Sequence, residues 1–279
     1  MTSTPNLPLV SIMMPARNAA KYLVATIESI QKQTYPHWEL IFVDDGSTDD
    51  TLTVIQRFAL LDTRIRVHPM PFGGRGRARN TCLTHVRGKY LAVCDADDIS
   101  FPNRFEKQVA FLEAHPNIGV VGSAWIPFAK EFPTETKPVR AFPSASLEIQ
   151  KAFKRGKMRV HNATVMLRSD LLNDFGTYNV ELRRAQDYEF FSRMSLHGVL
   201  FASMPEPLLY YRQEADIPSI AYFRENGMFM AYADTILNGR TQPFNEFATS
   251  LTGKFWHSYY TVKYLYFHLK LTFQNSVGR

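Results

Sequence analysis

Carboxylate side chains gather at two places in this sequence. Asp44 and Asp45 follow one strongly apolar stretch, and Asp95, Asp97 and Asp98 follow another. A buried strand that ends in adjacent acids concentrates negative charge, and the usual relief is a divalent cation or a hydrogen-bonded ligand. The two clusters therefore indicate a site where a cation holds an anionic group such as a diphosphate.

The sequence around these acids predicts repeated strand–helix units, which would position them. Residues 9–14 form a buried strand stopped by Pro15, and residues 20–33 carry apolar side chains at helical spacing. The alternation continues in further strands, whose predicted ranges are 39–43, 65–68 and 90–94. Such units predict a parallel sheet, and ligands of open parallel sheets bind beyond the carboxyl ends of the strands, where both acidic clusters fall.

The chain is less regular after this region. A helix is predicted from Pro102 to about Ala114, followed by a strand at residues 118–121. Four prolines between residues 127 and 145 predict a loop that crosses the open face of the sheet and touches substrate. The later predicted elements are a strand at 163–168, a helix at 186–197 and strands at 199–202 and 208–211.

The length, composition and charge of the chain limit the classes of protein to which it can belong. The 279 residues are 45% hydrophobic, which is ample for a core, and the net charge of +6 indicates an anionic partner. Cys82 and Cys94 lack metal-ligand spacing, so neither a disulfide framework nor a zinc site is expected. We expect a cytoplasmic protein, with peripheral contact to the inner face of the membrane left open, because the sequence shows no leader and no long apolar run. The turn at residues 15–18 lacks the glycines of a dinucleotide fingerprint, which disfavours hydride transfer.

Several motifs of the chain stand in the order found in one enzyme family. They are Val10-Ser11-Ile12, Pro15-x-x-Asn18, Gln33-Thr34-Tyr35, Glu39-Leu40-Ile41-Phe42-Val43-Asp44-Asp45-Gly46-Ser47-Thr48-Asp49, Ala78-Arg79-Asn80, Gly88-Lys89-Tyr90 and Asp95-Ala96-Asp97-Asp98. This order resembles family 2 glycosyltransferases of the GT-A fold over residues 9–212. The resemblance implies an α/β fold, with a Rossmann-like, mostly parallel sheet flanked by helices. The shift to aromatic-rich helical patterns beyond Pro218 predicts a C-terminal helical appendage.

The resemblance also implies an activity and a domain organisation. We expect an inverting, metal-dependent transferase that moves one sugar from a nucleotide-sugar donor, UDP-linked, to a hydroxyl of a glycan or lipid-linked acceptor, as in bacterial surface polysaccharide or lipopolysaccharide synthesis. The Gln-x-x-Arg-Trp motif of processive synthases is absent, which favours single transfer. The catalytic domain is expected at residues 1–218, with a nucleotide-sugar half (1–122) and an acceptor half (123–218), followed by an aromatic-rich helical extension at 219–279.

By resemblance, both acidic clusters serve the donor. Asp97 is expected to bind Mn²⁺ or Mg²⁺, with Asp95 beside it reaching the ion, the ribose or the sugar; helix capping is the alternative for Asp97. Asp45 is expected to accept a hydrogen bond from the base imide, which favours uracil or thymine because a carboxylate only accepts. Asp44 and Asp49 are weaker candidates, and Asp49 is more simply a first-turn acid of the next helix.

Further donor-site candidates surround the base and the diphosphate. They are Pro15, Arg17, Asn18, Ala96 and Arg79. Arg17 stands where the family commonly has Tyr, so its guanidinium is expected to stack on the base or to pair with a phosphate. Arg79 is expected to meet phosphate beside a glycine-rich loop. For its neighbours Arg75 and Arg77 a solvated basic loop is an equal alternative.

The acceptor side is expected in the second half of the catalytic domain. By resemblance, Asp187 is the base that takes the proton from the acceptor hydroxyl, and helix capping is its alternative. Gln186 replaces the acid that commonly precedes this base. His161 and Arg212 are further candidates near acceptor or phosphate, although a structural role explains His161 equally simply.

Other interpretations stay open at this point. The aromatic and lysine-rich tail fits a membrane surface that carries a lipid-linked acceptor, and it also fits packing on the catalytic body or a homodimer contact. A sugar nucleotidyltransferase is the second enzymatic interpretation. A non-catalytic module that binds polyanions through its arginines is the third, and a nucleic-acid partner is not expected because the acids beside those arginines would repel phosphates.

Overall fold

The predicted strands that end in the acidic clusters belong to one sheet. The computed structural model describes residues 7–129, 139–144, 146–155, 157–213, 219–239, 243–250 and 252–263. The chain forms two units. One consists of Met1–Tyr178 and Phe190–Glu214, and the other of Asn179–Glu189 and Ala215–Arg279.

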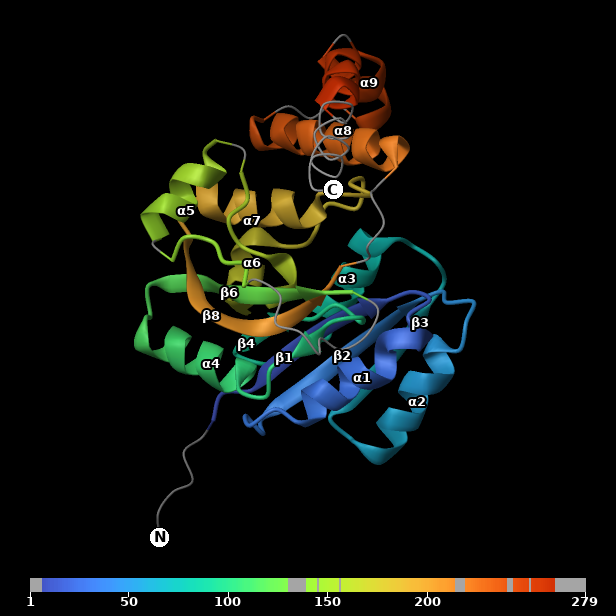
Figure 1. Ribbon diagram of the computed structural model, residues 1–279, viewed down its shortest axis with the longest axis vertical. Helices are drawn as coiled ribbons and strands as arrows, with labels where there is room; N and C mark the ends of the chain where they lie inside the picture. Colours follow the sequence, from blue (N-terminus) through green and yellow to red (C-terminus); the bar gives the residue numbers. More distant parts are fainter. Residues whose placement is uncertain are drawn as a thin grey trace, which may run out of the picture. The chain divides into compact units, whose positions relative to one another are not determined.

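The first unit is built on a mixed sheet with the strand order β3-β2-β1-β4-β7-β6-β8-β5 (Figure 1). In chain order the strands are β1 (Val10–Ala16), β2 (Trp38–Asp45), β3 (Ile65–Met70), β4 (Tyr90–Val93), β5 (Ile99–Ser100), β6 (Ile118–Phe128), β7 (Met166–Arg168) and β8 (Leu200–Arg212). β1 is parallel to β2 and β4, and β2 is parallel to β3. β7 is antiparallel to β4 and β6, β6 is parallel to β8, and β5 is antiparallel to β8.

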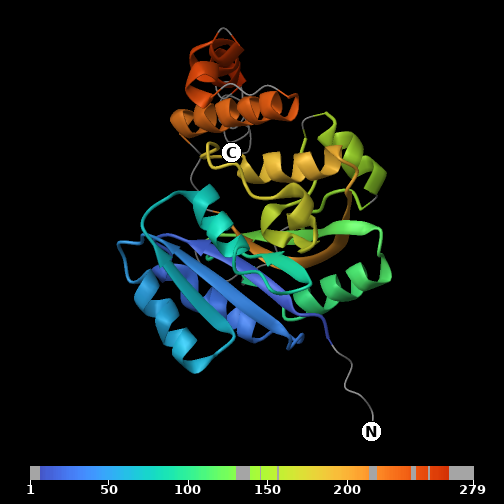
Figure 2. The same ribbon diagram turned by 180° about the vertical axis from the view of Figure 1, so that it is seen from behind.

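Successive side chains of the strands face two separate cores, because side chains alternate across a sheet. The helices are α1 (Ala20–Gln31), α2 (Thr51–Leu61), α3 (Arg75–Leu83), α4 (Arg104–Ala114), α5 (Ser146–Phe153), α6 (Leu171–Phe175) and α7 (Gln186–Leu196), with a 3₁₀ turn at Asn162–Thr164. Ile12 and Met14 pack with apolar residues of α1, α2 and α4. Met13 packs with α3, α5 and Phe190 of α7. Figure 1 shows α1 and α2 on one face of the sheet, and Figure 2 shows α3 on the other.

The predicted α/β fold is confirmed, with differences at several elements. The strands predicted at 199–202 and 208–211 are one continuous strand, β8, because its irregular register with β6 absorbs the prolines between them. The helix expected from Pro102 begins at Arg104, and the helix after the glycine-rich loop begins at Arg75. Of the proline-rich loop, residues 127 and 128 belong to β6, while 130–138 and 145 lie outside the described residues.

The second unit is helical in its described C-terminal part. It contains α8 (Ile220–Leu237), α9 (Phe244–Thr249) and a helix at residues 252–263. Phe229 of α8 stacks on Phe244 of α9, with ring centroids 4.2 Å apart. A Cβ on Gly227 would lie 2.2 Å from the ring of Tyr260, so this glycine lets the helix at 252–263 approach α8. Among the described residues, no helix combines the length and the apolar character needed to cross a membrane.

Candidate active site

The carboxyl ends of β1, β2 and β4 form one edge of the sheet in the first unit. The register pairs Ala16 with Asp44, and Met13 with Val93. β2 and β4 therefore flank β1, and the acids at their ends are separated by two strand spacings, about 10 Å. The structure thus brings both predicted acidic clusters to the same edge.

Asp45 holds the glycine-rich loop against the end of β2. Its buried carboxylate accepts hydrogen bonds from the backbone N–H of Gly73, at 2.6 Å, and of Gly74, at 3.0 Å. Gly46 has a φ of +64°, and a Cβ there would lie 2.6 Å from the backbone nitrogen of Phe72. A carboxylate offers about four acceptor positions, so these bonds leave acceptor capacity for the base imide that the sequence predicts as its partner.

The turn after β1 is tied to the loop after β2. Asn18 adopts a φ of +54°, and its Oδ1 accepts a hydrogen bond from the backbone N–H of Thr48 at 2.8 Å. Asp49 accepts from the backbone N–H of Thr51 at 3.0 Å and of Ala20 at 3.2 Å. These contacts give Asn18 and Asp49 structural roles in shaping the edge.

Arg17 and Phe72 form an exposed pair where the resemblance places a base-stacking Tyr. The guanidinium carbon of Arg17 lies 4.2 Å from the centroid of the Phe72 ring, and 64% of Phe72 is exposed. This is a cation–π distance. Phe72 was missed in the sequence because nothing local marks an aromatic ring before two glycines as a partner of a residue in the first turn.

Asp44 is the least satisfied acid of the first cluster. It is buried, and its Oδ2 accepts from the backbone N–H of Ser47 at 3.2 Å. Its Oδ1 is buried without a hydrogen-bond partner among the residues that the structure describes.

The second cluster combines two partly exposed acids with a buried one. Asp95 and Asp97 are partly exposed, whereas Asp98 is only 2% exposed. Burial, together with the charges of Asp95 and Asp97, raises the pKa of Asp98 well above its ordinary value. The loop therefore carries concentrated negative charge, which a divalent cation would relieve.

Arg212 braces the backbone of this acidic loop. Its Nε donates to the carbonyl of Asp97 at 2.9 Å, and its backbone N–H donates to Oδ1 of Asp98 at 2.7 Å. The guanidinium carbon lies 4.0 Å from the ring centroid of Tyr22 and 4.4 Å from that of Phe128. The acceptor-side role predicted for Arg212 stays a prediction, since the contacts described are with the acidic loop, Tyr22 and Phe128.

The remaining predicted residues lie in separate surroundings. Arg79 is 8% exposed, with its guanidinium carbon 5.2 Å from the ring centroid of Tyr178, while Arg75 and Arg77 are exposed. The His161 ring lies 4.4 Å from that of Trp125 and 4.4 Å from that of Tyr211.

Asp187 lies in the segment 179–189, which belongs to the second unit. Its Oδ1 accepts from the N–H of the next residue, Tyr188, at 2.9 Å, and Gln186 beside it is 3% exposed. Ala185, just before the helix, has a φ of +61°, which is uncommon for a residue other than glycine. The sequence predicts this segment within the catalytic domain, at residues 1–218, and predicts the extension at residues 219–279.

Side chains of α8 hold residues 179–189 at three points. Tyr188 donates a hydrogen bond from its hydroxyl to Asp234, and Arg184 pairs with Glu225 at 2.7 Å. Tyr232 donates to Glu181, with 2.7 Å between the oxygens. Contacts with α8 therefore fix the backbone on both sides of Asp187.

Asp95 and Asp97 suit a metal ion that is coordinated partly by the protein and partly by the phosphates of a substrate. No cluster of three or more His, Cys, Asp or Glu side chains with metal-binding geometry occurs in the described part of the chain. Mg²⁺ usually takes one or two carboxylates and completes its shell with water and substrate phosphates. The donor set of Asp95 and Asp97 matches that mode rather than a closed protein cage.

The chain was compared with known proteins. The profile of "Glycosyl transferase family 2" matches residues 11–175. An uncharacterized glycosyltransferase of Haemophilus influenzae is 34% identical over 228 residues, which cover 79% of this chain and 70% of that protein. The Escherichia coli enzyme UDP-Glc:alpha-D-GlcNAc-diphosphoundecaprenol beta-1,3-glucosyltransferase WfgD is 40% identical over 105 residues, or 37% of this chain and 41% of that enzyme.

Solved structures show the same fold. S. aureus TarS 1-349 in complex with UDP-GlcNAc superposes with a TM-score of 0.62 at 22% identity, covering 88% of this chain and 74% of that one. The mannosyltransferase PcManGT from Pyrobaculum calidifontis, with GDP-Man and Mn²⁺, gives a TM-score of 0.59 at 17% identity, with 92% and 74% covered. The matched profile spans the strands and loops that carry both acidic clusters, and so the chain belongs to glycosyl transferase family 2.

Proposed function

We propose that this glycosyltransferase moves a single sugar, with inversion, from a UDP-sugar to a hydroxyl of a lipid-linked or glycan acceptor in surface polysaccharide synthesis. The observation that carries the proposal is the edge formed by β1, β2 and β4. There the side chains of Asp95 and Asp97 are partly exposed while the backbone of their loop is braced by Arg212. Two partly exposed acids on a braced loop suit the binding of a divalent cation that is also coordinated by the diphosphate of the donor.

The nucleotide is assigned to the end of β2. Asp45 is fixed by the amides of Gly73 and Gly74 and accepts the imide N–H of uracil, which a purine does not present in the same way. The Arg17–Phe72 pair supplies a flat surface beside it for the base. The TarS complex with UDP-GlcNAc supports this donor class by analogy of fold.

The leaving group is assigned to the end of β4. Asp97, with Asp95, would hold Mn²⁺ or Mg²⁺, and that ion when bound supplies charge neutralisation for the departing diphosphate. Thr26 donates from its hydroxyl to the carbonyl of Ala96 at 3.1 Å and so fixes the loop from the side of α1. The PcManGT complex contains Mn²⁺, which supports a metal of this class.

Proton removal is assigned to Asp187. In an inverting transfer the acceptor oxygen attacks the anomeric carbon as the bond to the diphosphate breaks, and the hydroxyl proton passes to a carboxylate. Asp187 is half-buried, and the three contacts with α8 fix the backbone around it. The E. coli relative acts on a diphosphoundecaprenol-linked sugar, which supports a lipid-linked acceptor here.

Turnover of a panel of UDP-sugars with Mn²⁺ tests the assignment. Asp97→Asn and Asp187→Asn are each expected to lower kcat by about a hundredfold or more, in line with the loss of a general base or of an electrostatic stabiliser. Asp50→Asn is the matched control, because Asp50 is an exposed acid at the start of α2 whose side chain makes no capping bond. Full activity of both site variants would refute the residue roles, and turnover of none of the UDP-sugars would refute the donor class.

A further inference from the structure

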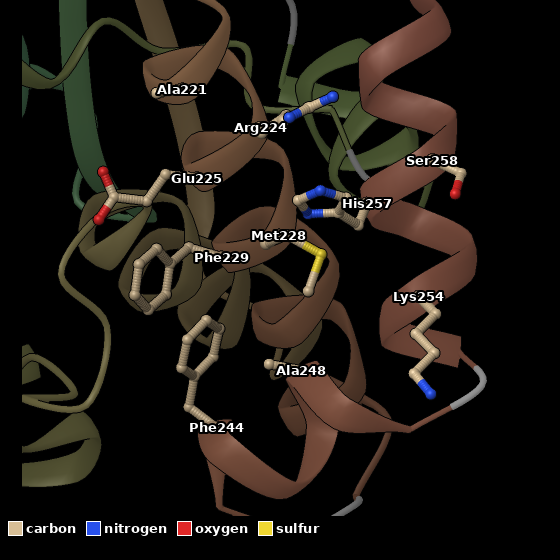
Figure 3. Close-up of a pocket in the computed structure, with 10 residues that line it drawn as sticks. All are labelled: Ala221, Arg224, Glu225, Met228, Phe229, Phe244, Ala248, Lys254, His257 and Ser258. Atoms are coloured by element: carbon tan, nitrogen blue, oxygen red, sulfur yellow. The ribbon is translucent and has the colours of Figure 1, made fainter.

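The second unit contains a pocket that the donor site does not use. Its volume is about 580 Å³, within the range of small-molecule sites, and it lies between α8, α9 and the helix at 252–263 (Figure 3). Its apolar lining includes Met228 and Phe229 of α8 and Phe244 and Ala248 of α9. Such a lining suits a hydrocarbon chain better than a free sugar or a nucleotide.

Two cationic side chains and a histidine stand around this apolar lining. Arg224 of α8 and Lys254 and His257 of the next helix belong to the wall of the pocket, and His257 points toward Arg224 and Met228 (Figure 3). Arg224 is held in place because its Nε donates to Oγ1 of Thr261 at 2.6 Å. Among the described residues that line the pocket the one acid is Glu225, which is paired with Arg184 at 2.7 Å. The remaining charge at the pocket is therefore positive.

The helix at 252–263 also presents an exposed apolar stripe. Phe255, Tyr259 and Val262, at i, i+4 and i+7, are 62%, 44% and 65% exposed. The face with Tyr260 packs against Gly227, and the face with Lys254 and His257 lines the pocket, so the stripe is a third face of the same helix. These twelve residues carry lysines and no acid. An apolar stripe with cations beside it is typical of a helix that lies at a membrane surface.

We propose that this pocket binds the lipid diphosphate of the acceptor, with the phosphates at Arg224, Lys254 and His257 and the first carbons of the chain on Met228, Phe229 and Phe244. The inference rests on the proposed transfer to a lipid-linked hydroxyl and names the part of the acceptor that the second unit recognises. Charge complementarity selects an anionic head, and the apolar lining selects a head that is attached to a hydrocarbon chain.

Calorimetric titration of the full chain with farnesyl diphosphate tests this site. EDTA is present throughout, because without a cation the acids of the donor site repel diphosphate. Farnesyl diphosphate is expected to bind at least tenfold more tightly than inorganic pyrophosphate. The double variant Lys254→Gln/His257→Gln is expected to weaken it by about tenfold or more, because both side chains are proposed to contact the phosphates. Lys263→Gln, on the same helix but outside the pocket wall, is the matched control and is expected to change binding by less than about twofold.

Three results would overturn the proposal. The first is unchanged affinity in the double variant, and the second is pyrophosphate binding as tight as that of the farnesyl compound. The third is displacement of farnesyl diphosphate by phosphatidylglycerol vesicles at equal lipid concentration, which would show a general membrane contact. Hydrolysis of the UDP-sugar without acceptor separates the two proposals. If hydrolysis depends on Asp97 while lipid binding fails, only the pocket assignment is lost; if neither occurs, the proposed function fails as well.

Discussion

Arg212 makes a quantitative prediction possible, because its hydrogen bond to the acidic loop and its two ring contacts have defined distances. Arg212→Met keeps the length and apolar contacts of the side chain but removes the guanidinium. The variant loses a charged hydrogen bond to the carbonyl of Asp97, worth about 1.5–3 kcal/mol. It also loses two cation–π contacts, with Tyr22 and Phe128, worth about 0.5–1 kcal/mol each at a partly exposed site. The bond from its backbone N–H to Asp98 remains.

These losses loosen Arg212, which holds the loop that is proposed to bind the metal. Since such contributions are not additive, we expect about 3 kcal/mol less stabilisation of the ordered loop. If half of that loss appears in metal-assisted donor binding, the apparent constant for Mn²⁺ rises by about tenfold. Titration of Mn²⁺ at a fixed UDP-sugar concentration measures this constant, and urea unfolding measures the loss of overall stability.

Two controls separate positioning from general destabilisation. Arg168→Met removes hydrogen bonds to the carbonyls of Ile118, at 2.9 Å, and Leu112, at 2.6 Å, and is expected to lower stability without changing the Mn²⁺ constant. Arg212→Lys keeps the charge but not the planar group between two rings, so we expect only partial recovery. An Mn²⁺ constant within twofold of the parent in Arg212→Met would refute the bracing role.

Three further predictions follow from the contacts around the site. Phe72→Ala removes the stacking partner of Arg17 and is expected to raise the KM for the UDP-sugar by about fivefold with little change in kcat, measured by steady-state kinetics. Asp234→Asn weakens the bond from the Tyr188 hydroxyl and is expected to lower kcat about tenfold with an unchanged KM for the donor. Hydrogen bonds from Arg64 lower the pKa of Asp62 to about 2, so its stabilisation is complete above pH 3.8 and lost as pH falls through about 2. Asp62→Asn is therefore expected to flatten the acid limb of the stability curve in urea unfolding.

Each of these has an outcome that contradicts it. If Phe72→Ala lowers kcat without raising the KM for the UDP-sugar, the ring contributes to the chemical step rather than to binding the nucleotide base. A change in donor KM in Asp234→Asn would show that α8 acts on the donor. Parallel stability curves for the parent chain and Asp62→Asn between pH 6 and pH 2 would show that the carboxylate has the same pKa when unfolded.

The sequence predicted those parts of the site that depend on local order. β2 is an apolar run that ends in Asp44 and Asp45, and β4 is an apolar run that ends two residues before Asp95. Both strand ends can therefore be predicted without tertiary information, and parallel alternation brings them to one edge. The glycine-rich loop was also visible, although its bond to Asp45 was not, because an acid at a strand end gives no sign of which amides it will meet.

The contacts that were missed join residues far apart in the chain. Arg212 and Asp97 are separated by 115 positions, and nothing in the periodicity of β8 indicates that its last residue holds another loop. β7 is only three residues long, so its antiparallel direction follows from its place between β4 and β6 rather than from its own pattern. The link between residues 179–189 and α8 rests on scattered polar pairs, which a composition-based boundary does not detect.

Residues 179–189 group with the C-terminal helices, and this grouping decides which segments must be exchanged together when related enzymes are recombined. The predicted base is anchored through Tyr188, Arg184 and Glu181, each of which bonds to a side chain of α8. A recombinant that replaces only residues from 215 onward would leave these three side chains facing foreign partners. A recombinant that also carries 179–189 would transfer the base together with its supports. Inheritance of acceptor choice in such enzymes is therefore expected to follow a discontinuous block of sequence, one piece inside the donor-binding domain and one after it.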